Sequence, residues 1–376
     1  MIGTAAASMD RRSPWQAIRQ YVMVFDGTLL LAMALVVLIS VATMYSAAFD
    51  FPGRFAGHAR NLGVAAAVMW LAAIVPPAIL MRLALPLYLL GIALLIAVDL
   101  FGIINKGAQR WLDLGFTRIQ PSEMLKIATP LMLAWYFNQR EGMLRWTDFL
   151  VATVLLALPV LLIAKQPDLG TSILVLAAGA YVIFFAGLSW KIIFGLGALA
   201  LASMPLLWSV LHDYQRQRVM TLIDPTSDPL GKGFHIIQST IAVGSGGLWG
   251  KGWMLGTQTH LEFIPERTTD FILAVYAEEF GLLGIGVLML LYLAIISRGL
   301  VIAGSAATVF GRLMAGSITM SFFTYCFVNI GMVIGILPVV GVPLPWMSYG
   351  GTAMVTLGLG AGIMMSIHRH RTLVQT

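Results

Sequence analysis

Residues 271–296 read FILAVYAEEFGLLGIGVLMLLYLAII, and this stretch decides the class of fold. Its only charged residues are Glu278 and Glu279. A helix of this length rises about 1.5 Å per residue and crosses a hydrocarbon core about 30 Å thick. The whole chain has the same character, because 59% of its 376 residues are hydrophobic and 11% are charged, against about 25% charged residues in an average soluble domain. A lipid bilayer is therefore the solvent for most of this chain.

Similar apolar runs recur along the sequence and predict an all-α polytopic membrane protein with about ten transmembrane helices. The predicted spans are residues 28–48, 61–80, 83–103, 121–138, 148–164, 170–187, 191–211, 271–296, 313–337 and 346–367. We expect one integral membrane domain over residues 1–376, in which residues 1–27 form a cytoplasmic N-terminal segment and the first helix is retained. A large extracytoplasmic loop, residues 212–269, separates the seventh span from the eighth, and its many apolar residues predict short interfacial or re-entrant helices.

The distribution of Lys and Arg predicts that both termini are cytoplasmic. When two long loops on the opposite side are set aside, most of the remaining cations lie on the side of the termini. The two long outer loops, residues 106–120 and 212–269, are exceptions to the excess of Lys and Arg on the cytoplasmic side. Their cations include Arg110, Arg216, Arg218, Lys251 and Arg267. An anionic ligand at the outer face would explain this excess, because Arg forks suit phosphate oxygens. The alternative is that these are solvated loop charges.

Asp270 stands directly before a span that starts at Phe271, so it is a carboxylate at the membrane boundary. Burial raises the pKa of such a carboxyl and nearby cations such as Arg267 lower it, so this site can be tuned for proton abstraction. The simpler interpretation is that Thr269 or Asp270 caps the N-terminus of the following helix. The two interpretations are compatible.

Charged residues also fall inside the predicted spans. Glu278 and Glu279 lie about two turns into a span, where acids are costly and typical of functional sites; a satisfied structural acid is the alternative. Pro121 suits the first position of a helix, which places Glu123 and Lys126 three residues apart on one helix face. These two residues are expected to neutralise each other, either as a packing lock or as a substrate contact.

The residues argue against three features, a P-loop, a set of metal-ligating side chains and a disulfide. The glycine-rich stretch 244–252 is not a P-loop, because Ser245 and Gly252 stand where that motif needs Gly and then Ser or Thr. His260 has no neighbouring ligand at metal-binding spacing, so no metal-ligating residues are predicted. Cys326 is the single cysteine, which excludes a disulfide within the chain.

Several blocks of the sequence resemble the SEDS family of shape, elongation, division and sporulation proteins. They are Lys106-Gly-Ala-Gln-Arg-Trp111, Gln120-Pro-Ser-Glu123, Lys165-Gln-Pro-Asp-Leu-Gly-Thr171, residues 250–279, Asn329-Ile-Gly-Met-Val-Ile-Gly335, and the run from Ile336-Leu-Pro338 to Ser348-Tyr-Gly-Gly351. The segments 260–263 and 365–371 are more similar to the elongation branch of the family than to the division branch. Thr268 stands where the family usually has His.

The resemblance implies a peptidoglycan glycosyltransferase of the bacterial inner membrane, which polymerises glycan strands from lipid II for cell elongation and rod shape. Lipid-pyrophosphate donors are α-linked and the glycan is β-1,4-linked, so one inverting displacement needs a base for the acceptor 4-hydroxyl and cations for the departing undecaprenyl pyrophosphate. Asp270 would be the base. The residues implied to contact substrate are Arg110, Trp111, Glu123, Lys126, Arg216, Arg218, Lys251, Glu266, Arg267, Glu278 and Ser348.

The resemblance also implies partners. A class B penicillin-binding protein is expected to supply transpeptidation within the elongation machinery, and a divalent cation, Mg²⁺ or Mn²⁺, is expected to assist at the leaving group. No organic cofactor and no nucleic acid are expected. Two other functions stay open at this point, a lipid II flippase or transporter and a non-catalytic scaffold for the penicillin-binding protein. A flippase needs sites accessible from both faces, whereas the charged motif residues gather in the outer half.

Overall fold

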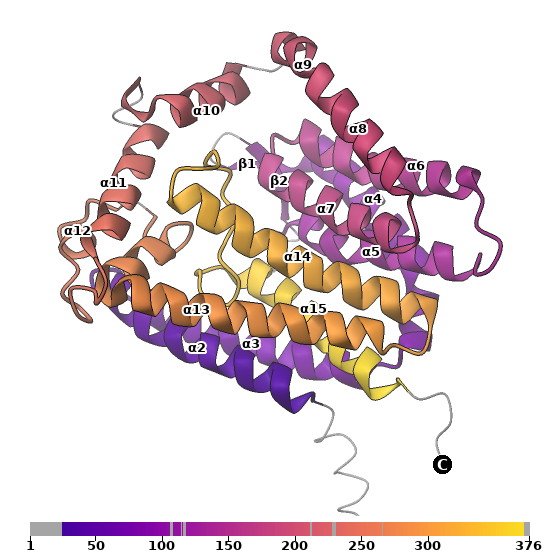
Figure 1. The fold of residues 1–376 in the computed structure, drawn as a ribbon, viewed down its shortest axis with the longest axis horizontal. Coiled ribbons are helices and arrows are strands. Elements are labelled where there is room, and N and C mark those ends of the chain that lie inside the picture. The colour runs from indigo at the N-terminus through magenta and orange to yellow at the C-terminus, as the bar shows by residue number, and fades with distance from the viewer. Residues whose placement is uncertain are drawn as a thin grey trace, which may run out of the picture.

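The computed structural model of the chain describes residues 25–105, 108–113, 115, 118–210, 213–227, 231–264 and 266–371. Its elements are α2 (Gly27–Ala47), α3 (Arg54–Ile74), α4 (Pro77–Phe101), β1 (Ile103–Asn105), β2 (Ala108–Asp113), β3 (Arg118–Ile119), α5 (Pro121–Asn138), α6 (Trp146–Lys165), α7 (Leu169–Phe185), α8 (Trp190–Ala202), α9 (Met204–Val210), α10 (Asp213–Ile223), η1 (Pro225–Ser227), α11 (Lys232–Ser245), α12 (Thr257–His260), α13 (Ile272–Gly304), α14 (Val309–Val333) and α15 (Gly351–Arg369). The long helices form one bundle, and α8 to α11 follow an arc that leaves the bundle after α7 and returns to it at α12 (Figure 1).

Six of the described helices are long and apolar enough to cross a membrane, namely α2, α4, α6, α13, α14 and α15. Helix α7 and part of α8 are apolar but shorter. The prediction of a helical, multi-pass membrane protein is therefore confirmed, while the number of ten spans stays a prediction.

The second and third predicted spans are displaced along the chain. The sequence predicts helices at 61–80 and 83–103, whereas α3 ends at Ile74 and α4 begins at Pro77. The intervening Val75 and Pro76 are extended, with ψ angles of 120° and 147°. A residue that precedes proline is pushed out of the α region, and proline suits the first helical position. The Pro-Pro pair therefore sets the turn, which windowed hydropathy does not detect.

Helix α13 is interrupted at Gly281, whose backbone (φ 64°, ψ −163°) is not helical. A regular helix would pair the carbonyls of residues 278–279 with the N–H groups of residues 282–283. The carbonyls instead accept from the N–H groups of residues 251–252, each at 3.0 Å, and the N–H groups donate to the carbonyls of residues 247–248 at 2.9 and 3.1 Å. The glycine-rich segment is thus inserted into the hydrogen-bond ladder of α13. The break leaves these backbone groups satisfied, as a bilayer requires.

Glycine is required in the inserted segment, residues 246–252, because its backbone lies very close to the backbone of α13. A Cβ at Gly246 would lie 2.1 Å from the carbonyl oxygen of Ala277, and a Cβ at Gly250 would lie 2.1 Å from that of Glu279. Gly250 also has a positive φ of 80°. These glycines therefore serve close backbone packing.

Helices α3 and α15 also pack closely through glycine. A Cβ at Gly358 would lie 2.4 Å from the carbonyl oxygen of Ala65, and a Cβ at Gly362 would lie 2.3 Å from that of Met69. The small-xxx-small spacing of these two glycines predicts such close packing, and the prediction is confirmed. Gly331 and Gly335 have the same spacing, but Gly335 has a φ of 76° and lies beyond the end of α14, so the two glycines do not share one helix face.

Two segments between helices have structure of their own. Strands β1, β2 and β3 form a small antiparallel sheet between α4 and α5, an exception to the all-α prediction. In the predicted outer loop, α10, η1, α11 and α12 are short helices. Helix α11 lies against α14, because Ser239 Oγ donates to the carbonyl oxygen of Val333 at 2.8 Å. Trp249 is 80% exposed and Trp253 49% exposed, as expected of side chains at a membrane interface.

The two ends of the bundle are distinguished by their charged residues. At one end, called here the Asp26 end, Asp26 accepts hydrogen bonds from Arg298 at 2.6 and 3.0 Å and lies 3.3 Å from His368. The start of α2 and the end of α15 therefore lie at the same end (Figure 1). The opposite end holds the turn before α13 and is called the Asp270 end.

Candidate functional site

Asp270 lies in the turn that precedes α13. The helix begins at Ile272, and its N-cap residue Phe271 makes no side-chain capping hydrogen bond. Thr269 Oγ1 donates instead to the carbonyl and carboxylate oxygens of Glu266, at 3.1 and 2.9 Å. The structure therefore does not show the capping alternative. The Asp270 side chain is partly exposed, and a Cβ at Gly341 would lie 3.5 Å from its Oδ2.

Backbone hydrogen bonds fix the turn around Asp270. Asn329 of α14 donates from Nδ2 to the carbonyl oxygens of Asp270 and Val342, at 2.9 and 2.8 Å. The N–H of Tyr349 donates to the carbonyl oxygen of Thr268 at 2.8 Å. Residues 268–270 are thereby held against the segment between α14 and α15. The side chain of Thr268, which stands where the family usually has His, is buried and packs inside the turn.

Arg267 binds residues at the end of α2 and in the turn that follows it. It is 4% exposed, donates from Nε to the carbonyl oxygen of Ala47 at 3.0 Å, and pairs with the carboxylate of Asp50. Its guanidinium carbon lies 5.0 and 4.9 Å from the ring centroids of Phe49 and Phe51. Burial alone would raise the pKa of Asp50, but the hydrogen bond and charge of Arg267 outweigh it and hold that pKa below its usual value. Arg267 therefore fastens the turn after α2 to the turn before α13.

Lys251 of the inserted segment pairs with Glu278 of α13. Lys251 Nζ lies 2.7 Å from Glu278 Oε1 and 2.7 Å from Thr257 Oγ1. Glu278 is fully buried and also accepts from the N–H groups of Gln258 and Thr259 at the start of α12, at 2.8 and 3.2 Å. Glu278 thus has the satisfied structural arrangement that the sequence left as an alternative.

Glu279 lies beside Glu278 and is likewise buried. Its Oε1 accepts from Ser46 Oγ of α2 and from the N–H of Met254 at 3.2 Å. Among the described residues, its Oε2 has no hydrogen-bond partner. The two acids together join α2, α12 and the inserted segment to the first part of α13.

Arg110 of β2 and Asp168 form a second cluster at the same end. Arg110 Nη1 lies 3.8 Å from Asp168 Oδ1, and Gln120 Nε2 donates to Asp168 Oδ2 at 3.1 Å. Asp168 also caps α7, accepting from the N–H of Thr171 at 3.2 Å, as the sequence predicts for an aspartate directly before an apolar run. A Cβ at Gly170 would lie 2.7 Å from the carbonyl oxygen of Val340. This cluster and Asp270 therefore flank the same short segment, residues 340–342.

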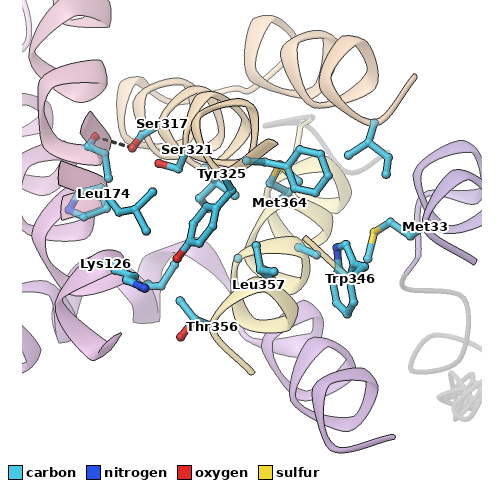
Figure 2. Close-up of a pocket in the computed structure, with 18 residues that line it drawn as sticks. Met33, Lys126, Leu174, Ser317, Ser321, Tyr325, Trp346, Thr356, Leu357 and Met364 are labelled. Atoms are coloured by element: carbon cyan, nitrogen blue, oxygen red, sulfur yellow. Dashed lines mark hydrogen bonds between the residues drawn. The ribbon is translucent and has the colours of Figure 1, made fainter. Parts of the chain in front are cut away.

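Glu123 and Lys126 lie deeper in the bundle. Lys126 Nζ is 2.6 Å from Glu123 Oε1, which confirms that the two neutralise each other, and it lies 5.3 Å from the centroid of the Tyr325 ring. Thr356 Oγ1 donates to Glu123 Oε2 at 3.3 Å. Figure 2 shows Lys126, Tyr325 and Thr356 around one cavity, whose volume is about 50 Å³ and whose other walls are mainly apolar.

The other residues that were predicted to contact substrate are dispersed over the Asp270 half of the molecule. Trp111 lies on β2, opposite Ile103 of β1. Ser348 is buried and its Oγ accepts from the N–H of Leu344 at 2.7 Å, so it shapes its own turn. Arg216 donates to the carbonyl oxygens at the end of α9, at 3.0 and 2.7 Å. The side chain of Arg218 lies outside the described residues.

Arg54, at the start of α3, belongs to the site but is not among the predicted contacts. Its guanidinium carbon lies 4.6 Å from the ring centroid of Tyr349 and 5.3 Å from that of Phe51. It is half-buried and, within the described part of the chain, its guanidinium has no ion pair or hydrogen bond. In the sequence, Arg54 is an arginine shortly after an apolar run, a pattern so common in membrane proteins that it does not indicate a functional residue. Only the fold brings it beside Tyr349, whose backbone binds Thr268.

The described residues do not provide a ready set of ligands for the expected divalent cation. No group of three or more His, Cys, Asp or Glu side chains comes together in the described ranges. Asp50, Asp168 and Glu278 are already held by cations and N–H groups of the protein.

Comparison with known proteins identifies relatives over most of the chain. The family model of the FtsW, RodA and SpoVE cell cycle proteins matches residues 20–373. The peptidoglycan glycosyltransferase MrdB of Escherichia coli strain K12 is 53% identical over 350 residues, which cover 93% of this chain and 95% of that protein. MrdB of Helicobacter pylori strain 26695 is 36% identical over 306 residues, 80% of this chain and 79% of that protein.

Solved structures show the same fold. One is a chain from a study of how a peptidoglycan synthase complex coordinates polymerization and crosslinking; its TM-score is 0.81 at 33% identity, covering 94% of this chain and 100% of that one. The rod shape determining protein RodA of Thermus thermophilus has a TM-score of 0.70 at 28% identity, covering 93% of this chain and 98% of that one.

Proposed function

We propose, because the chain belongs to the FtsW, RodA and SpoVE family of cell cycle proteins, that Asp270 is the general base of a peptidoglycan glycosyltransferase. The chain is a multi-pass membrane protein, and its relatives named as glycosyltransferases cover nearly its whole length. The position of Asp270 carries the assignment of the base. It is a partly exposed carboxylate whose backbone is fixed by Asn329, whereas Glu278 and Glu279 are buried and hold the fold together.

The substrate is lipid II at the outer face of the inner membrane. Asp270 takes the proton from the 4-hydroxyl of the acceptor sugar while that oxygen bonds to the anomeric carbon of the donor. The bond from this carbon to the pyrophosphate breaks with its electron pair, so undecaprenyl pyrophosphate leaves and the α-linkage becomes a β-1,4 linkage. One displacement by one base accounts for the inversion.

Cations must neutralise the departing pyrophosphate. Arg54 suits this role, because its guanidinium is half-buried at the Asp270 end and makes no ion pair with another described residue. Arg110 is a second candidate, since its side chain is 32% exposed and its contact with Asp168 is long. Arg267 and Lys251 are already paired with Asp50 and Glu278 and act by holding the site together.

This role places the Asp270 end at the outer face and the Asp26 end, with both termini, in the cytoplasm. A class B penicillin-binding protein is the expected partner for crosslinking. The similarity to a chain of a peptidoglycan synthase complex supports such a partnership.

The experiment measures polymerisation of fluorescent lipid II by the purified full chain, with and without the partner transpeptidase. Asp270→Asn is expected to lower the rate about 10²- to 10⁴-fold, the usual contribution of a general base. Asp113→Asn is the matched control, because it makes the same change at an exposed carboxylate on β2.

Full activity of Asp270→Asn would refute the base assignment. Transfer of labelled lipid II between liposome leaflets without any polymer would instead show a flippase. Polymer formed only by the partner, whether or not this chain is wild type, would show a scaffold. A thermal unfolding profile equal to that of wild type ensures that lost activity is not lost folding.

A further inference from the structure

A pocket of about 460 Å³ lies at the Asp26 end, far from Asp270 along the bundle. It is formed where the turn after α5 meets the ends of α7, α13 and α14. Its walls are mainly apolar and include Phe185, Leu300 and Leu313. The volume falls within the range of about 300 to 1,000 Å³ that is typical of small-molecule sites.

Two exposed side chains of opposite charge, Glu141 and Arg312, line this pocket. In the part of the chain that the structure describes, neither side chain has an ion pair or a hydrogen bond, and they do not pair with each other. Arg312 is in the first turn of α14, where the helix dipole disfavours a cation. The N–H groups of this turn are occupied, since Phe310 donates to Asn138 Oδ1 and Gly311 donates to Thr308 Oγ1, each at 3.0 Å. An unpaired arginine in this position calls for an anion that the protein does not supply.

The pocket lies at the boundary of the bilayer. Helices α13 and α14 are both candidate membrane spans, and the pocket is at their connected ends. Leu300 is 42% exposed and Phe185 39% exposed, so apolar surface continues from the pocket toward the lipid. A molecule that fills this site therefore has an apolar part in the bilayer and a charged part at its surface.

We propose that this pocket binds a phospholipid with a zwitterionic, primary-amine headgroup, that is, a phosphatidylethanolamine. The phosphate pairs with the guanidinium of Arg312, whose parallel N–H groups suit two phosphate oxygens. The ammonium donates to the carboxylate of Glu141, and the acyl chains lie along Leu300 and Leu313. An anionic headgroup without an ammonium would bring its charge near Glu141 with no compensation. A quaternary ammonium has no N–H to donate.

The test is native mass spectrometry of the purified full chain, titrated separately with phosphatidylethanolamine, phosphatidylglycerol and phosphatidylcholine of the same acyl chains. We expect phosphatidylethanolamine to bind most tightly. Arg312→Gln and Glu141→Gln should each weaken that binding about tenfold, the equivalent of about 1.4 kcal/mol. The matched control is Arg82→Gln on α4, an exposed arginine that does not line the pocket.

Each other outcome overturns the proposal. Equal binding of phosphatidylcholine would show that the ammonium N–H groups are not recognised. Tighter binding of phosphatidylglycerol, strengthened by Glu141→Gln, would show a site for anionic lipids. Equal binding by all four proteins would show that the lipid binds elsewhere. The site is independent of catalysis, so lipid II polymerisation by Arg312→Gln in detergent should stay at the wild-type rate even if Asp270 proves not to be the base.

Discussion

Asn329 donates a hydrogen bond from its side-chain amide to the carbonyl oxygen of Asp270 at 2.9 Å, and the same nitrogen donates to Val342 at 2.8 Å. Asn329→Ala removes both bonds and loosens the turn that carries the base. A misplacement of about 1 Å can cost on the order of 10²-fold in rate. We expect kcat for lipid II polymerisation to fall at least about tenfold, with a smaller change in KM.

Ser317→Ala is the matched control for this prediction. It removes another buried hydrogen bond of α14, from Ser317 Oγ to the carbonyl oxygen of Ala178 at 2.7 Å. Equal losses of kcat in the two variants would show that α14 stability, and not the position of Asp270, limits the rate.

The pair of Arg267 and Asp50 predicts a pH-dependent stability. Because Arg267 lowers the pKa of Asp50 in the folded protein, the unfolded chain binds the proton more readily. The contribution is complete above the unfolded pKa of about 3.9 and is lost as the pH falls through the folded value. Asp50 is partly exposed, so we expect about 1 kcal/mol, measured by urea unfolding between pH 3 and pH 7. Asp50→Asn should unfold more easily at pH 7 and lose this part of the pH dependence. An unchanged pH profile in Asp50→Asn would contradict the prediction.

The close approach of the inserted segment to α13 predicts that Gly246→Ala is strongly destabilising. The added Cβ would lie 2.1 Å from the carbonyl oxygen of Ala277, so one backbone must move. A loss of about 3 kcal/mol is expected, the upper end of the typical cost of overpacking, because backbone and not a flexible side chain must move. Gly244→Ala is the control, because a Cβ there has no atom within 4 Å. It should leave the melting temperature unchanged or raise it, and a similar fall in both variants would exclude the steric explanation.

Removing one member of the Glu123–Lys126 pair should cost more than removing both. Glu123→Gln leaves the ammonium of Lys126 buried with no carboxylate, which typically costs about 3 to 5 kcal/mol. The double variant Glu123→Gln with Lys126→Met should regain most of this stability, measured as the melting temperature in detergent. The activity of the double variant then separates the two interpretations of the pair. A stable, active double variant indicates a packing lock, and a stable, inactive one indicates a substrate contact. Equal destabilisation by the single and double variants would contradict the prediction.

The features that the sequence predicted correctly are local ones. The cap of α7 by Asp168, the start of α5 at Pro121 and the pairing of Glu123 with Lys126 each depend on residues a few positions apart. The packing of Gly358 and Gly362 on α3 follows from their spacing on one helix face. Rules of capping, helical spacing and small-residue packing are sufficient for these features.

The features that the sequence did not reveal join distant parts of the chain. Arg267 binds Asp50, a partner more than two hundred positions away that the sequence did not indicate, and its contact with substrate stays a prediction. Arg54 reaches the site only because α3 packs beside the segment that carries Tyr349. The break at Gly281 depends on the backbone of residues 246–252, and a hydropathy pattern carries no information on such a pairing.

The insertion of residues 246–252 into α13 has a mechanical consequence. The segment bonds to both parts of α13, because residues 251–252 donate to the carbonyl oxygens of residues 278–279 and the carbonyl oxygens of residues 247–248 accept from residues 282–283. The segment therefore acts as a splint across the non-helical Gly281 and couples residues 272–280 rigidly to the rest of the helix. Asp270 directly precedes this coupled helix and is also bound by Asn329 of α14, so the base is anchored to two helices of the bundle at once.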